Sequence, residues 1–250
     1  MLDHILFIFE GKRTEHVIAD SLLRFFIENE NKVVVKSSYG TNIYDLYKNI
    51  KDDEFIDIFA LIRERDNSLT SYSRDQFSQI YLFFDYDGHA PAASNDKLAE
   101  MLSFFNEETE NGKLFVSYPM VESTRYIADL TFESILVRDV IKLSDLTRFK
   151  EIVHNEAAPK YQNVTNYSKR DWQFLVNLHC KKANLIIGNG FVFPKSNVIS
   201  QEDILTNQNK NHIIPNNEVS ILSAFPLMIL DYYGVNSTRD KIYEKQINNT

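Results

Sequence analysis

The chain alternates between short apolar runs and longer stretches in which apolar residues recur every three or four positions. Runs of the first kind predict buried strands, and stretches of the second kind predict helices that bury one face. Strands are expected at residues 2–9, 33–35, 79–84 and 113–117, and helices at residues 14–29, 42–48, 54–64 and 95–105. Strands that alternate with helices at these lengths predict βαβ units.

We therefore expect an α/β fold in which a mostly parallel sheet is flanked by helices. The alternation is complete by about residue 118, and the pattern then becomes mainly helical, with an amphipathic stretch at 170–187 and an apolar one at 217–232. Residues 157–167 predict a polar loop, and residues 200–218, which are rich in Asn and Gln, predict an exposed connection. The expected plan is an α/β core at 1–125 and a helical annex at 126–250 that packs on it.

Composition narrows the class of protein. A chain of 250 residues suits one large domain or a domain with a smaller annex. The single cysteine, Cys180, excludes a disulfide framework and a cysteine-based metal site. The net charge of −8 argues against a large phosphate-binding footprint. Without a cleavable signal pattern or an apolar run of membrane-spanning length, the sequence predicts a soluble, cytoplasmic protein with no membrane partner.

Two of the predicted strands end in acidic residues. Glu10 follows the first strand, and Asp85 and Asp87 follow the third. The carboxyl ends of parallel strands share one edge of a sheet, and alternate residues of an extended chain point the same way, so these carboxylates are expected to converge. Crowded carboxylates favour a hard cation, which predicts Mg²⁺ or Mn²⁺. The alternative is that acids follow strands simply as turn or cap residues.

The same acids carry a resemblance to a known family. Glu10 with its following glycine, and the later Asp85-x-Asp87 pair, resemble the Toprim domain of topoisomerases, primases and OLD-family nucleases over about residues 2–123. The resemblance implies a Toprim-like, Rossmann-like core. It also implies that Glu10 serves acid–base or metal chemistry and that Asp85 and Asp87 hold Mg²⁺.

Two further acids extend this resemblance. The segment from Glu10 to Glu15 looks like the nuclease branch, in which Glu15 is another metal ligand; a first-turn acid that complements the helix dipole is the alternative. Glu122, after the fourth strand, looks like the third acidic segment of small Toprim effectors in phage-defence systems, including the effector subunit of PARIS. This implies that Glu122 is a metal ligand or an orienting residue. It also implies a nuclease acting on DNA or tRNA, with an ABC-type ATPase as its activating partner.

Three other residues are candidates for phosphodiester chemistry, which two metal ions and their carboxylate ligands commonly support. Lys12 and Arg13, beside Glu10, are predicted to hold substrate phosphate or to stabilise developing charge, with solvated loop charges as the alternative. His89 is a candidate for protonating the leaving group, with an exposed loop histidine as the alternative.

The resulting hypothesis is a Mg²⁺-dependent Toprim nuclease, a toxin-like effector of an anti-phage defence system triggered by an ATPase partner. One alternative is a non-catalytic Toprim-like binding or regulatory subunit of an ATPase complex, which the net charge favours. Another is a haloacid-dehalogenase-like phosphatase, because residues 84–88 resemble the nucleophile loop of that family. That family expects Thr or Val where His89 stands, and its loop follows the first strand of the core. The oligomeric state, a homo-oligomer included, stays open.

Overall fold

A five-stranded sheet forms the centre of the molecule. The computed structural model describes residues 3–27, 31–51, 57–86, 88, 94–127, 139–196 and 198–244. The strands are β1 (Asp3–Phe9), β2 (Lys32–Ser38), β3 (Phe77–Asp85), β4 (Asn106–Glu107) and β5 (Gly112–Ser117), in the order β2-β1-β3-β5-β4. Every neighbouring pair is parallel except β4 with β5. The predicted α/β fold with a mostly parallel sheet is confirmed.

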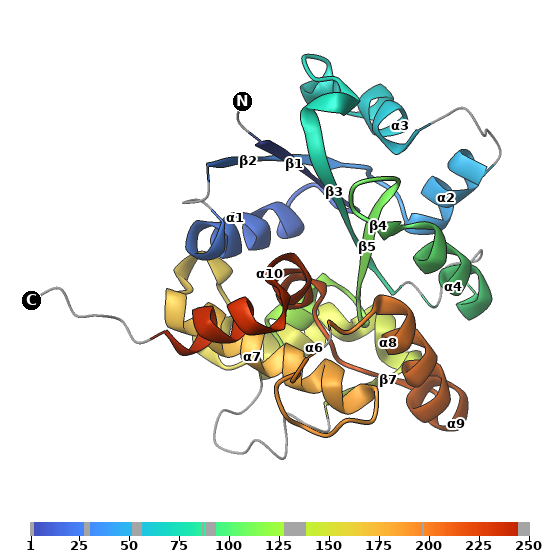
Figure 1. Ribbon diagram of the computed structural model, residues 1–250. Helices are drawn as coiled ribbons and strands as arrows, with labels where there is room; N and C mark the ends of the chain where they lie inside the picture. Colours follow the sequence, from blue (N-terminus) through green and yellow to red (C-terminus); the bar gives the residue numbers. More distant parts are fainter. Residues whose placement is uncertain are drawn as a thin grey trace, which may run out of the picture.

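Helices cover both faces of this sheet. In Figure 1, α1 (Thr14–Phe26) and α10 (Ala224–Tyr243) lie on one side, and α2 (Ile43–Lys51) and α4 (Asn95–Phe104) lie on the other. The side chains from Ile5 to Phe9 in β1 are all fully buried, as expected for a central parallel strand with both faces covered. The short helix α3 (Ile58–Arg65) and the 3₁₀ turns η1 (Asn67–Leu69) and η2 (Arg74–Gln76) lead into β3.

Aromatic rings fix α10 against the sheet. Phe225, near the start of α10, stacks on Phe83 of β3 with ring centroids 4.6 Å apart and planes 10° from parallel. Phe9 of β1 lies 6.1 Å from the same Phe225 ring. Aromatic pairs of this kind add stability beyond the area that they bury. The start of α10 is thereby held beside the carboxyl ends of β1 and β3.

The order of the strands defines where a site is expected. The chain passes from β1 to its neighbour β2, and then crosses back to β3 on the other side of β1. Near the strand ends, Ile8 pairs with Leu82 and Phe9 with Phe83. Connections leave in opposite directions from this pair, so the edge just beyond Phe9 and Phe83 is the topological switch point, where open α/β sheets bind ligands.

The second half of the chain is mainly helical. Its elements are η3 (Val121–Thr124), β6 (Val140–Lys142), η4 (Leu143–Arg148), α6 (Phe149–Glu156), η5 (Pro159–Tyr161), η6 (Val164–Asn166), α7 (Lys169–Ile186), α8 (Gln201–Gln208), the π-helical turn η7 (Asn209–Ile213), α9 (Ile214–Asn216) and β7 (Glu218–Ser220). Strands β6 and β7 form a small antiparallel sheet. Buried apolar side chains from β1 to α10 form one continuous cluster, and the predicted division at residue 125 stays a prediction. Within the described ranges, no helix combines the length and the apolar character needed to cross a membrane.

Three expectations for this half are wrong. Residues 200–218 are not an exposed connection but fold into α8, η7, α9 and β7, and Gln201 and Gln208 are buried. Residues 157–167 contain two 3₁₀ turns, and the side chains of Tyr161, which ends the first turn, and Tyr167, which follows the second, are buried. The last helix begins at Ala224 instead of residue 217, because β7 occupies the residues before it. Polar composition was misleading in the first two segments, since their apolar or amide side chains reach the core.

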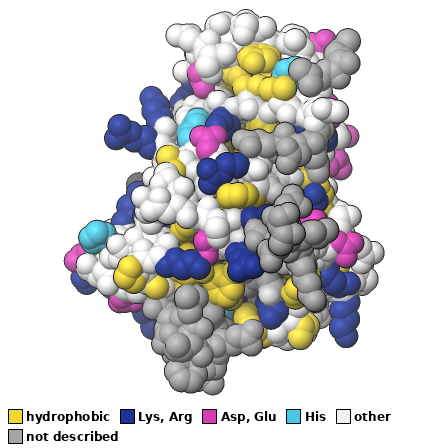
Figure 2. All heavy atoms as spheres, turned by 90° about the vertical axis from the view of Figure 1, so that its left-hand side faces the viewer, with side chains coloured by type: hydrophobic (Ala, Val, Ile, Leu, Met, Phe, Trp, Pro, Cys, Tyr) yellow, Lys and Arg dark blue, Asp and Glu magenta, His cyan; other side chains and the backbone are white. Residues whose placement is uncertain are grey.

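Cationic side chains do not gather into one field on the face of the molecule that Figure 2 shows. Lys and Arg side chains lie there in separate groups, several of them beside acidic or uncharged side chains. The ion pairs of the described residues mix the charges in the same way, as between Lys36 and Asp20 and between Lys160 and Asp171. This distribution agrees with the net charge of −8.

Candidate functional site

The switch point brings two of the predicted acids together. Glu10 follows β1 directly, and Asp85 is the last residue of β3. The Glu10 Oε2 atom accepts a hydrogen bond from the backbone N–H of Asp85 at 3.2 Å. The Asp85 Oδ1 atom accepts one from the backbone N–H of Val121 at 2.8 Å. The carboxylates are thus oriented by the backbone of neighbouring segments, and the sheet order explains why residues 75 positions apart meet.

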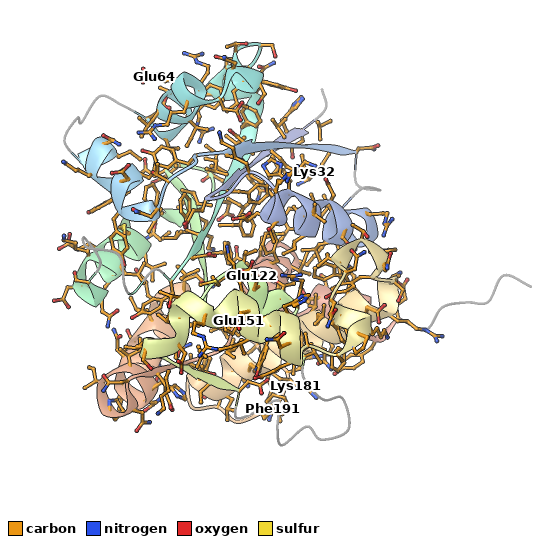
Figure 3. The ribbon with its side chains drawn as sticks, turned by 180° about the vertical axis from the view of Figure 1, so that it is seen from behind. Lys32, Glu64, Glu122, Glu151, Lys181 and Phe191 are labelled. Carbon is orange, nitrogen blue, oxygen red and sulfur yellow. The ribbon has the colours of Figure 1, made fainter. Side chains whose placement is uncertain are left out.

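Glu122 approaches from the turn η3, which follows β5. Its side chain is only 4% exposed, and its Oε2 atom has no hydrogen-bond partner among the described residues. Its Oε1 atom lies 3.8 Å from Lys150 Nζ and 4.0 Å from an Arg125 guanidinium nitrogen. Figure 3 shows Glu122 near the middle of the molecule, between the sheet and α6. Burial of a carboxylate oxygen without a hydrogen-bond partner costs free energy, so Glu122 is a candidate for binding a cation.

Glu15 closes the turn between β1 and α1. It lies in the first turn of α1, is 7% exposed, and accepts a hydrogen bond from the backbone N–H of Gly11 at 3.0 Å. Arg13 occupies the cap position of α1, and its side chain forms no cap hydrogen bond. Glu15 therefore has a local role at the helix start. Its role as a metal ligand stays a prediction.

Three neighbouring carboxylates act on Asp85. Burial, followed by the negative charges of Glu10, Glu15 and Glu122, raises the pKa of Asp85 well above its ordinary range. Like charges at short range disfavour the ionised form, and a cation reverses that penalty. The edge of the sheet is therefore an electrostatically unfavourable cluster at neutral pH, of the kind found at functional sites.

Gly11 is required by this packing, and substitution with alanine is expected to disturb it. A Cβ atom at Gly11 would lie 2.7 and 2.8 Å from the two Glu15 carboxylate oxygens. Gly11→Ala therefore displaces Glu15 and weakens the bond to the Gly11 N–H, at an expected cost of about 0.5–1.5 kcal/mol. Urea denaturation measures this cost.

A double-mutant cycle separates the contact from other effects of the alanine. In a Glu15→Ala background there is no carboxylate to displace, so the same Gly11→Ala change is expected to cost much less. An equal cost in both backgrounds would show that the contact with Glu15 is not what requires glycine here.

The predicted phosphate-binding residues lie at the surface beside the cluster. The Lys12 and Arg13 side chains are exposed. The backbone oxygen of Arg13 accepts a hydrogen bond from the Val17 N–H at 3.1 Å in the first turn of α1. Arg13 and Arg125 line a cavity of about 220 Å³ between α1 and η6. The Arg125 guanidinium also donates to the backbone oxygen of Gln162 at 3.1 Å. Arg125 was not predicted as a site residue. Its position three residues after Glu122 could have suggested this role from the sequence.

A second unpredicted group supports the turn after β1. The His16 ring nitrogen Nε2 lies 2.7 Å from Ser38 Oγ, which donates to the backbone oxygen of Gly11 at 2.9 Å. Burial lowers the pKa of His16, so its ring is neutral at neutral pH. This contact joins the end of β2 to α1, and no local pattern in the sequence reveals it.

A complete metal-ion site is not preformed in the described part of the chain. Asp87 and His89 lie outside the described residues. Among the residues that are described, no three His, Cys, Asp or Glu side chains are grouped so as to hold a metal ion. The donor set still fits a hard divalent cation, because it consists of carboxylate oxygens and includes the unpartnered Glu122 Oε2.

Comparisons with known proteins add no family to this description. Neither the protein-family models, nor the curated proteins, nor the solved structures gave a match to this chain. The fold and site define an α/β protein with an acidic cluster at the switch point of its sheet, and its function is argued from that site.

Proposed function

We propose that this chain is a Mg²⁺- or Mn²⁺-dependent nuclease with a Toprim-like core, which hydrolyses phosphodiester bonds in DNA or tRNA. The observation that supports this function best is the cluster of Glu10, Asp85 and Glu122 at the switch point, beside the exposed cations Lys12 and Arg13. Carboxylates suit a divalent cation, and adjacent cations suit a phosphodiester, so the two groups together fit this substrate class.

The cation would be held by Glu10, Asp85 and Glu122, with Asp87 as the fourth ligand expected from the sequence and Glu15 as a fifth candidate. When bound, it lowers the pKa of a water molecule and offsets charge on the phosphodiester. The Val121 N–H orients the Asp85 carboxylate, and the Asp85 N–H orients that of Glu10. Such preorganised groups spare the reorganisation that flexible ones need.

The remaining residues act on the substrate. Lys12 and Arg13 bind the phosphate oxygens, and Arg125, which lines the same cavity as Arg13, contributes a third cationic group. The buried Glu122 side chain lies within 4.0 Å of Arg125 and Lys150, whose positive charges offset part of its negative charge. His89, four positions after Asp85 in the sequence, is the candidate for protonating the leaving oxygen.

The biological setting follows from the resemblance alone. A Toprim effector of an anti-phage system, released or activated by an ABC-type ATPase, would act only after its partner responds to infection. The charge of −8 and the separate cationic groups in Figure 2 are consistent with a partner or a second copy that supplies part of a nucleic-acid surface.

The same observations favour a second candidate, a non-catalytic Toprim-like subunit of an ATPase complex. In that case the acidic surface docks a basic partner, and the carboxylates bind only a structural cation. The scattered cations and the net charge support it. It differs from the first candidate in one respect, since the isolated chain would not cut nucleic acid.

Cleavage by the purified chain tests the proposal. DNA and tRNA are incubated separately with the protein in Mg²⁺ and in Mn²⁺, with EDTA as the control. We expect cleavage that disappears in Glu10→Ala and Asp85→Ala. Cleavage that persists in both variants would contradict the assignment as a nuclease. If the chain cuts nucleic acid neither alone nor with its ATPase partner, the non-catalytic subunit is favoured instead.

A further inference from the structure

Two adjoining cavities form a groove along α1. The first, of about 220 Å³, is lined by Arg13 at the start of α1, by Arg125 and by residues 162–164. The second, of about 390 Å³, is lined by Arg24 near the end of the same helix. Val17, whose side chain is 41% exposed, lines both. The groove therefore follows the helix from Arg13 to Arg24, over about 16 Å at 1.5 Å per residue.

The groove is narrow because its two walls are joined beneath it. The segment η6 lies beside α1 (Figure 1), and the Ser21 hydroxyl of α1 donates to the backbone oxygen of Val164 in η6 at 2.9 Å. The buried Trp172 indole N–H donates to the same hydroxyl at 2.9 Å. One sugar–phosphate backbone can lie between walls this close. The two backbones of a duplex, which are held apart across a major groove about 12 Å wide, cannot.

The charges along the groove favour a polyanion. Arg13 and Arg24 are exposed, and the Arg125 side chain is 27% exposed. The acid in the lining, Asp20, forms an ion pair with Lys36, which offsets its charge. The other described residues of the lining are uncharged. Guanidinium groups bind phosphate oxygens through charge-assisted hydrogen bonds, so both ends of the groove suit a phosphate group.

An amide on the second wall adds a donor. Asn163 is exposed and lines the same cavity as Arg13. Its Oδ1 atom accepts hydrogen bonds from the Thr165 N–H at 3.1 Å and from the Thr165 hydroxyl at 2.7 Å. Only the oxygen of an amide can accept from an N–H group, so these bonds fix its orientation and leave the Asn163 NH₂ group as a donor at the surface. Amide donors of this kind commonly bind phosphate and sugar oxygens.

The groove begins beside the acidic cluster. Arg13 stands three residues after Glu10, and an Arg125 guanidinium nitrogen lies 4.0 Å from Glu122 Oε1. We propose that the groove binds the phosphodiester backbone of a single nucleic-acid strand, which extends from the cluster along α1 toward Arg24. The position of the cut bond next to this strand rests on the proposed function, whereas the binding of the strand does not.

Fluorescence anisotropy of the full chain with labelled oligonucleotides tests this inference. Single-stranded DNA, single-stranded RNA and duplex DNA of one sequence are titrated in EDTA, so that binding is measured without metal-dependent cleavage. We expect at least one of the single strands to bind more tightly than the duplex. Comparison of the two single strands shows whether the groove prefers DNA or RNA.

Replacement of Arg24 by alanine tests the end of the groove that is distant from the acidic cluster. Arg24→Ala is expected to weaken single-strand binding about fivefold, and to reduce the salt dependence of binding by the loss of about one phosphate contact, a slope change of about 0.7. Arg24→Lys retains the charge and should retain the slope. Arg63→Ala is the matched control, because Arg63 is another exposed helical arginine that lies over a phenylalanine ring, and it lines neither cavity.

Val17→Glu places a carboxylate in the middle of the groove. We expect single-strand binding to weaken about tenfold or more through charge repulsion, with little change in the thermal unfolding midpoint, since Val17 is exposed and glutamate is favoured in helices. Binding that neither Arg24→Ala nor Val17→Glu weakens would overturn the inference. Tighter binding of the duplex would overturn it too, as would no binding up to about 100 µM, the weak limit of non-specific association.

The outcome for the groove is separable from the outcome for the nuclease. Strand binding that depends on Arg24, without cleavage in Mg²⁺ or Mn²⁺, would support the groove and contradict only the nuclease activity. Cleavage together with unchanged binding in both variants would contradict only the groove.

Discussion

Replacement of Asp85 by asparagine is expected to abolish cation-dependent cleavage and, at the same time, to stabilise the cation-free protein. Asparagine keeps an oxygen that accepts from the Val121 N–H, so the local backbone contact is retained. It removes one of the negative charges that Glu10, Glu15 and Glu122 oppose. Activity is expected to fall by at least about 10²-fold, the lower end of what a positioned catalytic group contributes.

The stability gain has a defined dependence on pH. The folded-state pKa of Asp85 is raised above its unfolded value, so the wild-type protein loses stability as the pH rises through the folded-state pKa. Asparagine does not ionise, and the advantage of the variant should therefore be largest at alkaline pH and shrink as the pH falls. A gain of about 1 kcal/mol corresponds to roughly 2–4 °C in a chain of this size.

Thermal unfolding with and without Mg²⁺ checks this prediction. Mg²⁺ should raise the melting temperature of the wild-type protein, because a ligand stabilises the state that binds it, and should have little effect on Asp85→Asn. Asp240→Asn, at an exposed position of α10, is the matched control and should behave like the wild type. An Asp85→Asn protein that is less stable than the wild type and still responds to Mg²⁺ would contradict the account.

Replacement of Lys182 by methionine is expected to destabilise the protein by about 3–5 kcal/mol, the usual cost of leaving one partner of a buried ion pair uncompensated. Lys182 Nζ lies 3.1 Å from Asp139 Oδ2, and the two side chains are 2% and 7% exposed. Burial lowers the pKa of Lys182 and raises that of Asp139, so each group depends on the other for its charge. The pair links α7 to the residue that precedes β6.

The double variant Lys182→Met/Asp139→Leu separates the pair from the cavity that it fills. Removal of both charges should restore most of the lost stability, since an apolar replacement of a buried pair is often neutral. In the single variant, Asp139 can regain neutrality by binding a proton, so its deficit should shrink as the pH falls. Urea denaturation between pH 5 and pH 8 measures both effects, and a double variant as unstable as the single one would rule out this explanation.

This region also supports the acidic site. His179, one turn before Lys182 in α7, accepts a hydrogen bond from the Ser223 N–H at 3.1 Å. The Ser223 hydroxyl lies 2.7 Å from that of Thr124, in the same short turn as Glu122. These buried polar contacts join α7 and the start of α10 to the turn that carries Glu122.

Much of the fold followed from the periodicity of the sequence, because β1 and β3 are continuous apolar runs that only a doubly covered sheet can bury. The order of the strands could not be predicted from the sequence, because no local pattern indicates that β1 lies between β2 and β3. That order brings Glu10 to Asp85, so their contact was an expectation from fold class and not from spacing.

Glutamine side chains explain the largest error. Gln208 donates to the backbone oxygen of Ser220 at 2.8 Å and accepts from its N–H at 2.9 Å. Gln201 accepts a single hydrogen bond from the Val116 N–H at 3.1 Å. Each amide thus forms hydrogen bonds with an edge strand that a neighbouring strand would otherwise form. A segment rich in Asn and Gln therefore looked solvated in the sequence, although some of its amides satisfy buried backbone groups.

Contacts at the site were the least predictable part. Glu15 was assigned either to the helix start or to a metal, and the structure shows the first contact without testing the second. The contacts of Arg125 with Gln162 and of His16 with Ser38 join segments that meet only after folding. Sequence patterns name the residue types that a site needs, but they contain little information on which distant side chains will approach them.

Diffraction from crystals soaked in Mn²⁺ tests the central claim most directly, since the anomalous signal locates the ion independently of any assumed function. The account predicts a peak at the carboxyl ends of β1 and β3, with oxygen atoms of Glu10 and Asp85 among its ligands, and predicts that Asp85→Asn removes it. A fully soaked crystal with no peak there, or with a peak bound only by other residues, would contradict the claim that this acidic edge is a divalent cation site.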